Sequence, residues 1–375
     1  MARPPILFIV HVPPPVHGAA LVGSFLVNSQ RLRRAFDVRV VPVSLSKRVI
    51  DVGHVTLAKV FGTLQLMVRA ARVARNHTPE IVFVTPSISG PALLRDLLLV
   101  LHIRLALGRT TTILAHLHMR PVANGRLYRL GRRVLLSVAI PVVLNRLLAE
   151  EIAPLASNRP VVLENGIPDP CPGIDLKVTT LKRLSSKPRI LFLGHLSEAK
   201  GFPEVLRLAR AAPHWDFDIA GSFGTMADER KFQAYLTRNP HATRRIAFHG
   251  QVGETQKDEL FRAASALVLP SRSEAMPLVI IEALAYGVPV VATRVGAIPD
   301  MIDDTIGRVV EVPGDMQSAV GSLFQQDAQA LAERCRRVFV ARFSLARFEG
   351  QAERLLFRFA AESQIGRLRN DERSY

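Results

Sequence analysis

Short apolar runs alternate with longer amphipathic stretches along the chain, and this alternation predicts strands and helices in turn. In the first half, the runs that predict buried strands are Ile6–Val10, Val38–Pro42, Ile81–Val84, Thr112–Ala115 and Val142–Leu144. The stretches between them predict helices, the longest being Ala20–Phe36, Val55–Asn76 and Pro91–Leu107. Alternating strands and helices are typical of a parallel sheet that is covered by helices on both faces.

The pattern pauses at residues 167–188, which hold four prolines and show little periodicity. It then restarts, and predicts strands over Arg189–Leu193, Phe217–Ala220, Arg245–Phe248, Ala266–Leu269 and Pro289–Ala292. We therefore predict an α/β fold with two Rossmann-like, doubly wound domains that face a cleft. The expected boundaries are residues 1–172 for the first domain, 173–188 for a linker and 189–345 for the second domain. Such sheets bind ligands at the carboxyl ends of their strands.

Composition narrows the class of protein. The chain has 375 residues, of which 48% are hydrophobic and 22% charged, a mixture typical of globular domains. Residues 1–178 hold 22 Lys/Arg and 9 Asp/Glu, a net charge of +13, whereas residues 179–375 hold 27 and 23, a net charge of +4. A basic first half suits anionic lipid, a phosphorylated acceptor or nucleic acid. Aromatic residues make up only 6%, and we find no nucleic-acid-binding signature, so we expect no nucleic-acid partner.

The cysteines and the apolar runs of the sequence indicate the cellular compartment of the protein. Cys171 and Cys335 are far apart and form no metal-ligand motif, which suits a reducing compartment. No run of about 18 uncharged apolar residues is present, and the first run is too short for a signal peptide. We therefore expect a cytoplasmic protein. Four basic residues at helical spacing predict either a solvated helix face or, together with Pro91–Leu107, a peripheral contact with the inner face of an anionic membrane: Arg126, Arg129, Arg132 and Arg133.

The stretch from residue 270 to residue 300 carries the clearest candidate chemistry. A strand, Ala266–Leu269, ends in a polar turn, Pro277 occupies the expected first helical position, and Gly287 ends the helix. A helix N-terminus at the carboxyl end of a strand presents free N–H groups that suit a phosphate. Glu274 and Glu282 lie before and within this helix, so their carboxylates can accept hydrogen bonds from sugar and ribose hydroxyls.

These two glutamates stand in a longer frame: Glu-Ala-Met-Pro, an apolar helix, Glu-Ala-Leu and then Gly-Val-Pro-Val-Val-Ala-Thr. The frame resembles that of the retaining GT-B glycosyltransferases of family 4. The resemblance implies a nucleotide-sugar donor, no metal cofactor, and contacts from Glu274 to the donor sugar and from Glu282 to the ribose. It also assigns the diphosphate to the backbone of four residues, Ala275, Met276, Pro277 and Leu278.

Two further loops carry the resemblance. The segment Leu193–Gly201 follows a strand and opens a helix, and Lys200 matches the family's diphosphate-binding lysine. His195 stands where the family has arginine, so this phosphate contact departs from the pattern. In the first half, Gly18 follows the first strand in a phosphate-type loop, where the family often has two glycines and this chain has one.

The remaining candidates also come from the resemblance. A family histidine after the fourth strand approaches the donor sugar; His118 fits that position best and His116 is its competitor. Gln251 and Val252 fall in the loop that holds the nucleotide base. The segment near Phe343 resembles the place where the chain crosses back, so residues 346–375 are expected to form a helix that returns to the first domain, and a tail.

We therefore predict a hexosyltransferase-type enzyme. It would move a sugar, with retention, from a UDP- or GDP-linked donor to a hydroxyl of a lipid-linked acceptor or growing glycan, in polysaccharide or glycolipid biosynthesis. Lys200, the helix N–H groups and His195 would stabilise the leaving diphosphate. Three alternatives remain open at this point: a sugar-nucleotide epimerase of the same fold, a basic nucleic-acid-binding protein, and a catalytically inactive relative.

Overall fold

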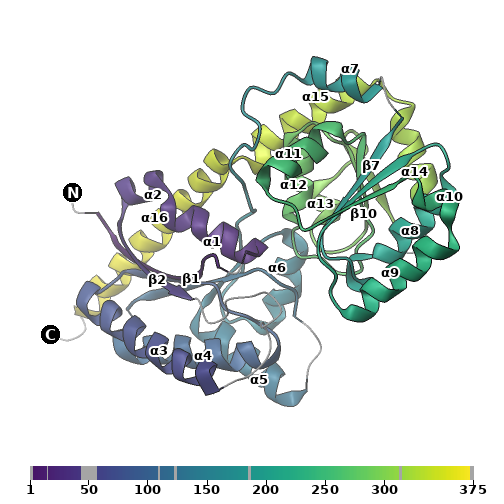
Figure 1. The fold of residues 1–375 in the computed structure, drawn as a ribbon. Coiled ribbons are helices and arrows are strands. Elements are labelled where there is room, and N and C mark those ends of the chain that lie inside the picture. Colours follow the sequence, from purple (N-terminus) through teal and green to yellow (C-terminus); the bar gives the residue numbers. More distant parts are fainter. Residues whose placement is uncertain are drawn as a thin grey trace. The chain divides into compact units, whose positions relative to one another are not determined.

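The chain forms two compact units (Figure 1), which are described separately. Unit 1 comprises Met1–Gly166 and Leu345–Tyr375, and unit 2 comprises Ile167–Ser344. The computed structural model describes residues 3–14, 16–43, 57–108, 110–121, 125–184, 187–311 and 315–371. For residues 57–60 and 365–371 it describes the backbone alone.

Unit 1 is built on a six-stranded, all-parallel sheet in the order β2-β1-β3-β4-β5-β6. Its strands are β1 (Pro5–His11), β2 (Asp37–Val43), β3 (Ile81–Val84), β4 (Thr112–Leu117), β5 (Ile140–Val143) and β6 (Val161–Val162). The five predicted strands are all present, and the short β6 is an addition. The strand order reverses between β1 and β3, so the carboxyl ends of these two strands mark the place where such sheets bind ligands.

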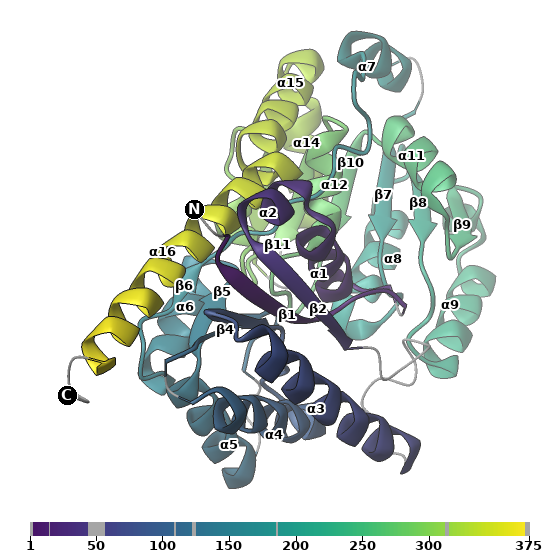
Figure 2. The same ribbon diagram turned by 90° about the vertical axis from the view of Figure 1, so that its left-hand side faces the viewer.

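Helices cover both faces of this sheet. They are α1 (Gly18–Asn28), α2 (Gln30–Ala35), α3 (Leu57–His77), α4 (Gly90–Leu107), α5 (Arg126–Val138), α6 (Arg146–Ile152) and α16 (Leu345–Asp371), with a short 3-10 turn, η2 (Ala153–Leu155). Helices α3, α4 and α5 lie side by side on one face (Figure 2), where their buried leucines, valines and alanines pack against alternate residues of β1 to β4. Helices α1, α2 and α16 contact the strands or one another on the other side of the sheet.

Three predictions about unit 1 need correction or qualification. The single helix expected over Ala20–Phe36 is two helices, because Ser29 is extended and its hydroxyl accepts a hydrogen bond from Leu32 N at 3.2 Å, which caps α2. The four arginines of α5 do not form one solvated face, since Arg132 is 5% exposed. Residues 372–375 of the expected tail lie outside the described residues, as do the first two residues of the helix expected over Val55–Asn76.

The C-terminal helix α16 belongs to unit 1. Its Glu353 pairs with Arg31 of the first half at 2.7 Å, and the rings of Phe357 and Phe36 lie 4.5 Å apart. Within the part of the chain that the structure describes, no helix is long and apolar enough to cross a membrane.

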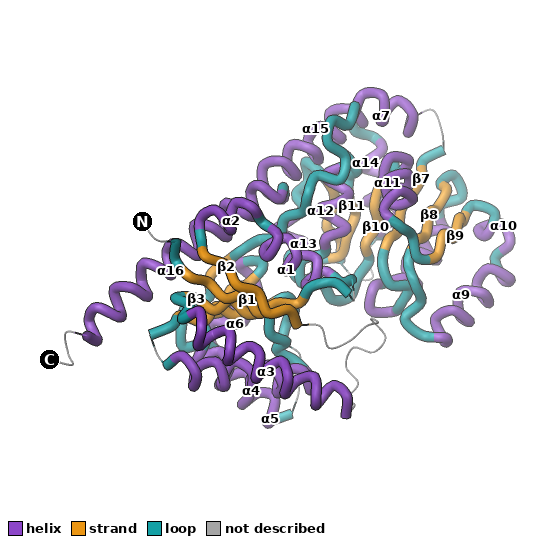
Figure 3. The backbone as a smooth tube through the Cα atoms, turned by 60° about the vertical axis from the view of Figure 1, so that its left-hand side comes forward, coloured by secondary structure: helices purple, strands orange, loops and turns teal. Residues whose placement is uncertain are grey.

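Unit 2 has a second six-stranded, all-parallel sheet, in the order β12-β11-β10-β7-β8-β9 (Figure 3). Its strands are β7 (Arg189–Leu193), β8 (Asp216–Ala220), β9 (Ile246–Gly250), β10 (Ala266–Leu269), β11 (Val290–Thr293) and β12 (Gly307–Val310). The predicted strands are present within two residues of their expected bounds, and β12 is an addition. The order reverses between β10 and β7, which makes their carboxyl ends the expected ligand site.

The helices of unit 2 are α7 (Leu176–Leu184), α8 (Phe202–Ala211), α9 (Met226–Arg238), α10 (Pro240–Thr243), α11 (Glu254–Ala263), α12 (Leu278–Ala285), α13 (Ile298–Met301), α14 (Met316–Phe324) and α15 (Ala328–Val338), with a 3-10 turn η3 (Glu198–Lys200) and a π-helical turn η4 (Phe339–Phe343). The described part of the linker expected over 173–188 is instead packed into this unit and carries α7. The Arg183 guanidinium donates to the carbonyls of Phe261 and Tyr286 at 3.1 and 3.0 Å, and burial lowers its pKa to about 10. A buried arginine that satisfies main-chain oxygens ties α7 to unit 2.

Candidate functional site

The loops after β7 and β10 meet where the strand order of unit 2 reverses. Gly201 has φ +68°, and a Cβ atom there would lie 1.8 Å from the carbonyl oxygen of Pro270, so only glycine allows this approach. The N–H of Arg272 donates to the Ala199 carbonyl at 2.9 Å. These contacts hold η3, and with it Lys200, against the loop that contains Glu274.

Lys200 and Glu274, both predicted from the sequence, form an ion pair. Lys200 Nζ lies 2.8 Å from Glu274 Oε1, and the Ser271 hydroxyl donates to the same oxygen at 2.8 Å. The Glu274 side chain is 8% exposed and that of Lys200 is 32% exposed. An ammonium group has three N–H donors, so Lys200 can hold an anion while it keeps the contact with Glu274.

The loop from Glu274 to Pro277 is shaped by the segment after β11. Gly296 has φ +57°, and a Cβ atom there would lie 2.0 Å from the Glu274 carbonyl oxygen. The next residue, Ala297, donates its N–H to the Ala275 carbonyl at 2.8 Å. Pro277 is the N-cap of α12 and not its first helical residue, one position from the prediction. The first N–H groups of α12, starting at Leu278, have no acceptor within the helix, as at every helix start.

Glu282 lies in the second turn of α12 and has its own lysine. Its Oε1 accepts a hydrogen bond from Lys257 Nζ at 2.9 Å, and Lys257 also contacts Glu254 at 3.1 Å. Burial raises the pKa of Glu282 above its usual value, and Lys257 opposes that rise. Burial lowers the pKa of Lys257, but the two carboxylates outweigh it and the net shift is upward. Each of the two predicted glutamates is thus paired with a different lysine.

Lys257 was not among the predicted site residues. It lies on α11, three positions after Glu254, a spacing that is common on solvated helix surfaces. No local pattern distinguishes it from such a surface pair. Only the packing of α11 near α12 brings its ammonium group to Glu282, so a single sequence carries no signal for it.

The other predicted residues of unit 2 lie in loops at the carboxyl ends of β7 and β9. His195 is exposed, and its Nδ1 is 3.3 Å from the Ser222 hydroxyl oxygen. Gln251 is exposed and Val252 half-buried, directly after β9. The neighbouring His249 contacts the buried Asp218 at 2.8 Å, which ties the end of β9 to β8.

In unit 1, Gly18 begins α1 directly after the loop that follows β1. The preceding His17 is the N-cap, and its Nδ1 accepts the N–H of Ala20 at 3.3 Å. His17 therefore has a structural role at the start of this helix. The loop lies where the order of the unit 1 sheet reverses, as expected for a ligand-binding edge. Pro15 of this loop lies outside the described residues.

The two competing histidines have different environments. His116 is inside β4 and fully buried, and burial lowers its pKa to about 3. His118 follows the strand, with its ring centroid 4.1 Å from that of His116. Burial and then the nearby His116, His11 and His17 hold the pKa of His118 well below its usual value. Its Nε2 is buried and has no hydrogen-bond partner among the described residues, so His118 is a neutral imidazole with an unused nitrogen.

His11, at the end of β1, was not singled out from the sequence. Its Nδ1 lies 3.0 Å from the Thr85 hydroxyl oxygen, and burial lowers its pKa to about 4. Histidines 11, 17, 116 and 118 thus gather at the carboxyl edge of β1 and β4. In the described parts of the chain, no group of three or more His, Cys, Asp or Glu is arranged to hold a metal ion.

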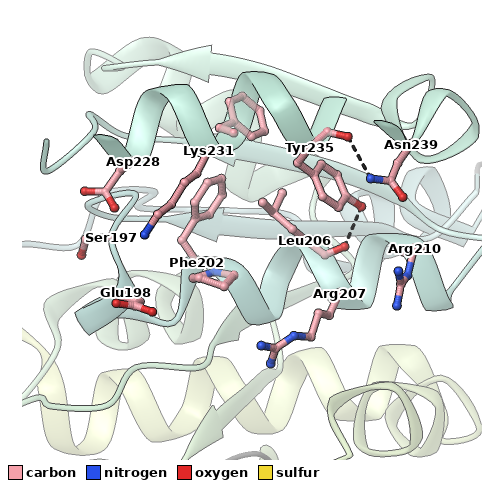
Figure 4. Close-up of a pocket in the computed structure, with 12 residues that line it drawn as sticks. Ser197, Glu198, Phe202, Leu206, Arg207, Arg210, Asp228, Lys231, Tyr235 and Asn239 are labelled. Atoms are coloured by element: carbon pink, nitrogen blue, oxygen red, sulfur yellow. Dashed lines mark hydrogen bonds between the residues drawn. The ribbon is translucent and has the colours of Figure 1, made fainter. Parts of the chain in front are cut away.

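A separate hollow of about 330 Å³ lies between α8 and α9 (Figure 4). Phe202, Leu206 and Phe232 are among its apolar lining residues. The Tyr235 hydroxyl donates to the Leu206 carbonyl at 2.7 Å and thereby joins the two helices. None of the predicted site residues lines this hollow, so it is distinct from the Lys200 and Glu274 pair.

The segment that holds both lysine–glutamate pairs is similar to known proteins. Residues 179–337 match the family model described as "Glycosyl transferases group 1". Over 90 residues, the chain is 41% identical to D-inositol 3-phosphate glycosyltransferase of Streptomyces griseus. That match covers 24% of this chain and 19% of the relative, so it spans about a fifth of the relative's length.

Solved structures resemble nearly the whole chain. Sucrose-phosphate synthase from Thermosynechococcus elongatus has a TM-score of 0.73 at 18% identity, covering 96% of this chain and 100% of that chain. HepE of Anabaena in complex with UDP-glucose has a TM-score of 0.69 at 17% identity, covering 94% and 98%. These likenesses confirm the predicted GT-B fold. The chain therefore has the GT-B fold, and its residues 179–337 match the family model of the group 1 glycosyl transferases.

Proposed function

We propose that this protein is a retaining glycosyltransferase, of the family 4 type, that takes a hexose from a UDP- or GDP-linked donor and transfers it to an acceptor hydroxyl. The observation that carries the proposal is the pair of lysine–glutamate contacts, Lys200 with Glu274 and Lys257 with Glu282, within the matched domain. The solved HepE structure holds UDP-glucose, which supports a UDP-linked donor over a GDP-linked donor.

The donor is expected to lie at the carboxyl edge of the unit 2 sheet. Glu282 accepts hydrogen bonds from the ribose hydroxyls and Glu274 from the hydroxyls of the sugar. The backbone of residues 275–278 and the ammonium of Lys200 hold the diphosphate, because helix N-termini and ammonium groups both favour anions. Gln251 and Val252 follow β9 and contact the base in this proposal.

In the reaction, the bond between the sugar C1 and the diphosphate oxygen breaks while the acceptor oxygen bonds to C1 on the same face. The acceptor's proton passes to the departing phosphate oxygen. Lys200 and the first N–H groups of α12 stabilise the negative charge that develops on the diphosphate, with His195 as a weaker donor where the family has arginine. The proposal requires neither a metal ion nor a protein nucleophile.

The residues of unit 1 have supporting roles in the proposal. His118 contributes a neutral ring nitrogen, which can donate to or accept from a sugar hydroxyl. Gly18 lets the backbone approach the ligand at the start of α1. The basic charge of the first half suits an acceptor with phosphate groups, so we propose a lipid-linked acceptor or a growing glycan of polysaccharide or glycolipid biosynthesis.

Thermal denaturation with nucleotides tests the donor site. We expect UDP or GDP and its sugar conjugate, at about 100 times the dissociation constant, to stabilise the folded protein by about 2.7 kcal/mol, with or without EDTA. Glu282→Gln should abolish this effect. Glu254→Gln is the matched control, because Glu254 also contacts Lys257 but its side chain is 88% exposed. Stabilisation by no nucleotide would refute the proposal, and an effect that EDTA removes would refute its metal-free form.

A further inference from the structure

Helices α3, α4 and α5 form one outer layer of unit 1. Their inward side chains, including Ala70, Leu99 and Leu135, belong to the core that packs on the sheet. Helix α4 contacts both of its neighbours, so the outward sides of the three helices make one continuous surface (Figure 2). We call this surface the α3–α4–α5 face.

Large apolar side chains are concentrated on the α3–α4–α5 face. Seven of the eighteen exposed large apolar residues among the described positions lie on these three helices, with exposed fractions between 55% and 84%. They are Phe61, Leu64, Val68, Leu98, Leu105, Leu127 and Leu130. On each helix their spacing is three, four or seven residues, so they line the same side. Exposed apolar side chains that are grouped on one helical layer point to an interaction surface.

The charges of the same helices have a single sign. Residues 57–77, 90–107 and 126–138 hold ten Lys/Arg and one acidic residue, Asp96. Asp96 is 3% exposed and pairs with Arg95 at 2.6 Å, so it does not reach the surface. Six exposed arginines make no ion pair with any described residue: Arg69, Arg72, Arg75, Arg126, Arg129 and Arg133.

Some exposed arginines of unit 2 have acidic partners, whereas others, such as Arg210 and Arg238, make no ion pair with a described residue. Arg262 pairs with Asp258 at 2.7 Å, and Arg294 pairs with Glu311 at 2.6 Å. An ordinary solvated surface intersperses charges of both signs, as unit 2 does. Among the described residues, the α3–α4–α5 face has no exposed acidic side chain, so its six exposed arginines have no acidic partner on these helices.

We propose that the α3–α4–α5 face docks on an anionic phospholipid surface. The arginines bind lipid phosphates bidentately, while the exposed leucines and Phe61 enter the boundary between headgroups and acyl chains. A two-fold contact between copies of the chain would bring this cationic surface against itself, which like-charge repulsion opposes. Nucleic acid would satisfy the arginines but leave the apolar side chains exposed. A bilayer satisfies both features.

The test is flotation of the full chain with vesicles of phosphatidylcholine alone or with added phosphatidylglycerol. We expect binding only to the anionic vesicles, and weaker binding at high salt because the charges are screened. Arg129→Glu with Arg133→Glu should lower the affinity by at least about 30-fold, because each basic side chain near an anionic surface contributes a factor of about five. Leu98→Ser with Leu105→Ser should also lower the affinity for anionic vesicles, because it removes two apolar side chains that enter the lipid.

Matched controls separate this surface from net charge and general hydrophobicity. Arg34→Glu with Arg347→Glu makes the same change in charge on α2 and α16, and Leu181→Ser with Leu184→Ser removes exposed leucines of α7. Both controls should bind anionic vesicles like the unmodified protein. All substituted positions are exposed, and circular dichroism checks the fold of each variant.

Several results would overturn the proposal. Equal binding to both vesicle types, or binding to neither, removes the anionic surface as the partner. A loss in the arginine control as large as in Arg129→Glu with Arg133→Glu shows that net charge acts and not this face. Light scattering that finds a dimer, lost in Leu98→Ser with Leu105→Ser while vesicle binding persists, assigns the face to a second copy. The experiment is independent of the transfer reaction, so its failure would leave the proposed function standing.

Discussion

The carboxylate of Glu282 and the ammonium of Lys257 are 2.9 Å apart, on two helices separated in sequence by β10. The side chains are 17% and 19% exposed, so this pair is mostly shielded from water. In the proposed site, a ribose hydroxyl must share Glu282 with Lys257. In that proposed site, the lysine favours the ionised form of Glu282, against the effect of burial.

We predict that Lys257→Met shifts the pH dependence of nucleotide binding. The pKa of Glu282 is already raised by burial, and the substitution removes the charge that opposes the rise. A carboxyl group accepts from both ribose hydroxyls only when ionised, so affinity falls as pH is lowered through this pKa. In the variant, the fall should begin at higher pH. Calorimetric titration of UDP or GDP from pH 8 downward measures the midpoint, and Lys231→Met on α9 is the control. An unchanged midpoint would contradict the role given to Lys257.

Loss of the Lys200 charge should affect turnover more than donor binding. In the proposed donor complex, the ammonium group of Lys200 contacts the diphosphate, where negative charge grows as the sugar leaves. Removal of one such preorganised donor typically costs about 10²–10³ in kcat. We expect Lys200→Met to lower kcat for donor hydrolysis or transfer by about this amount, with a smaller change in KM. A variant that raises KM alone would show that Lys200 contributes only ground-state binding.

Gly201 should tolerate no side chain. A Cβ atom there would lie 1.8 Å from the Pro270 carbonyl oxygen, and φ is +68°. Gly201→Ala must displace η3 from the end of β10, so we expect a lower melting temperature and weaker nucleotide binding. Gly253→Ala serves as the control, because a Cβ atom at that position meets no atom within 4 Å. Equal behaviour of the two variants would show that η3 does not need this close approach.

Acid should destabilise unit 1 through its buried histidines. The pKa values of His11 and His116 in the folded state are about 4 and about 3, below the usual 6.5. The unfolded chain therefore binds more protons below pH 6.5, and stability falls as pH drops from about 6.5 toward 4 for His11 and toward 3 for His116. Each histidine contributes up to about 1.4 kcal/mol per pH unit in this window.

The check is denaturant unfolding at a series of pH values. His116→Leu should flatten the decline below pH 6.5, since one fewer group takes up a proton on unfolding. His241→Gln replaces an exposed histidine and is the control. If His116→Leu leaves the slope unchanged, His116 is not the neutral buried group that the structure describes.

The parts of the molecule that follow from local sequence were predictable. Buried strands such as Ile81–Val84 are continuous apolar runs that are too short for a typical buried helix. Lys200 and Glu274 lie in loops directly after strands, where the topology itself brings residues together. Glu282 was proposed as a site residue from the sequence frame around it, in which one loop and one helix link it to Glu274 over eight residues.

The features that were not predicted depend either on contacts between segments distant in sequence or on a residue that is compatible with two local structures. Lys257 reaches Glu282 because α11 approaches α12, and no spacing along α11 encodes this contact. The Pro-rich segment after Gly166 suggested a linker, but Arg183 finds main-chain oxygens some 80 to 100 positions away. Ser29 suits either a continuous helix or a cap, and the cap prevails because its hydroxyl satisfies the N–H of Leu32.

Unit 1 is a discontinuous domain, and this has a consequence for the order in which the chain folds during synthesis. Its sheet strands are complete at Val162, but α16 begins only at Leu345, after all of unit 2 has been made. At ribosomal rates this interval is on the order of tens of seconds. Throughout it, Phe36 lacks its partner Phe357 and Thr110 lacks the Ser363 hydroxyl. The apolar surface of unit 1 that α16 later covers therefore stays exposed while unit 2 is synthesised. A chaperone that binds this surface would act at that stage of translation.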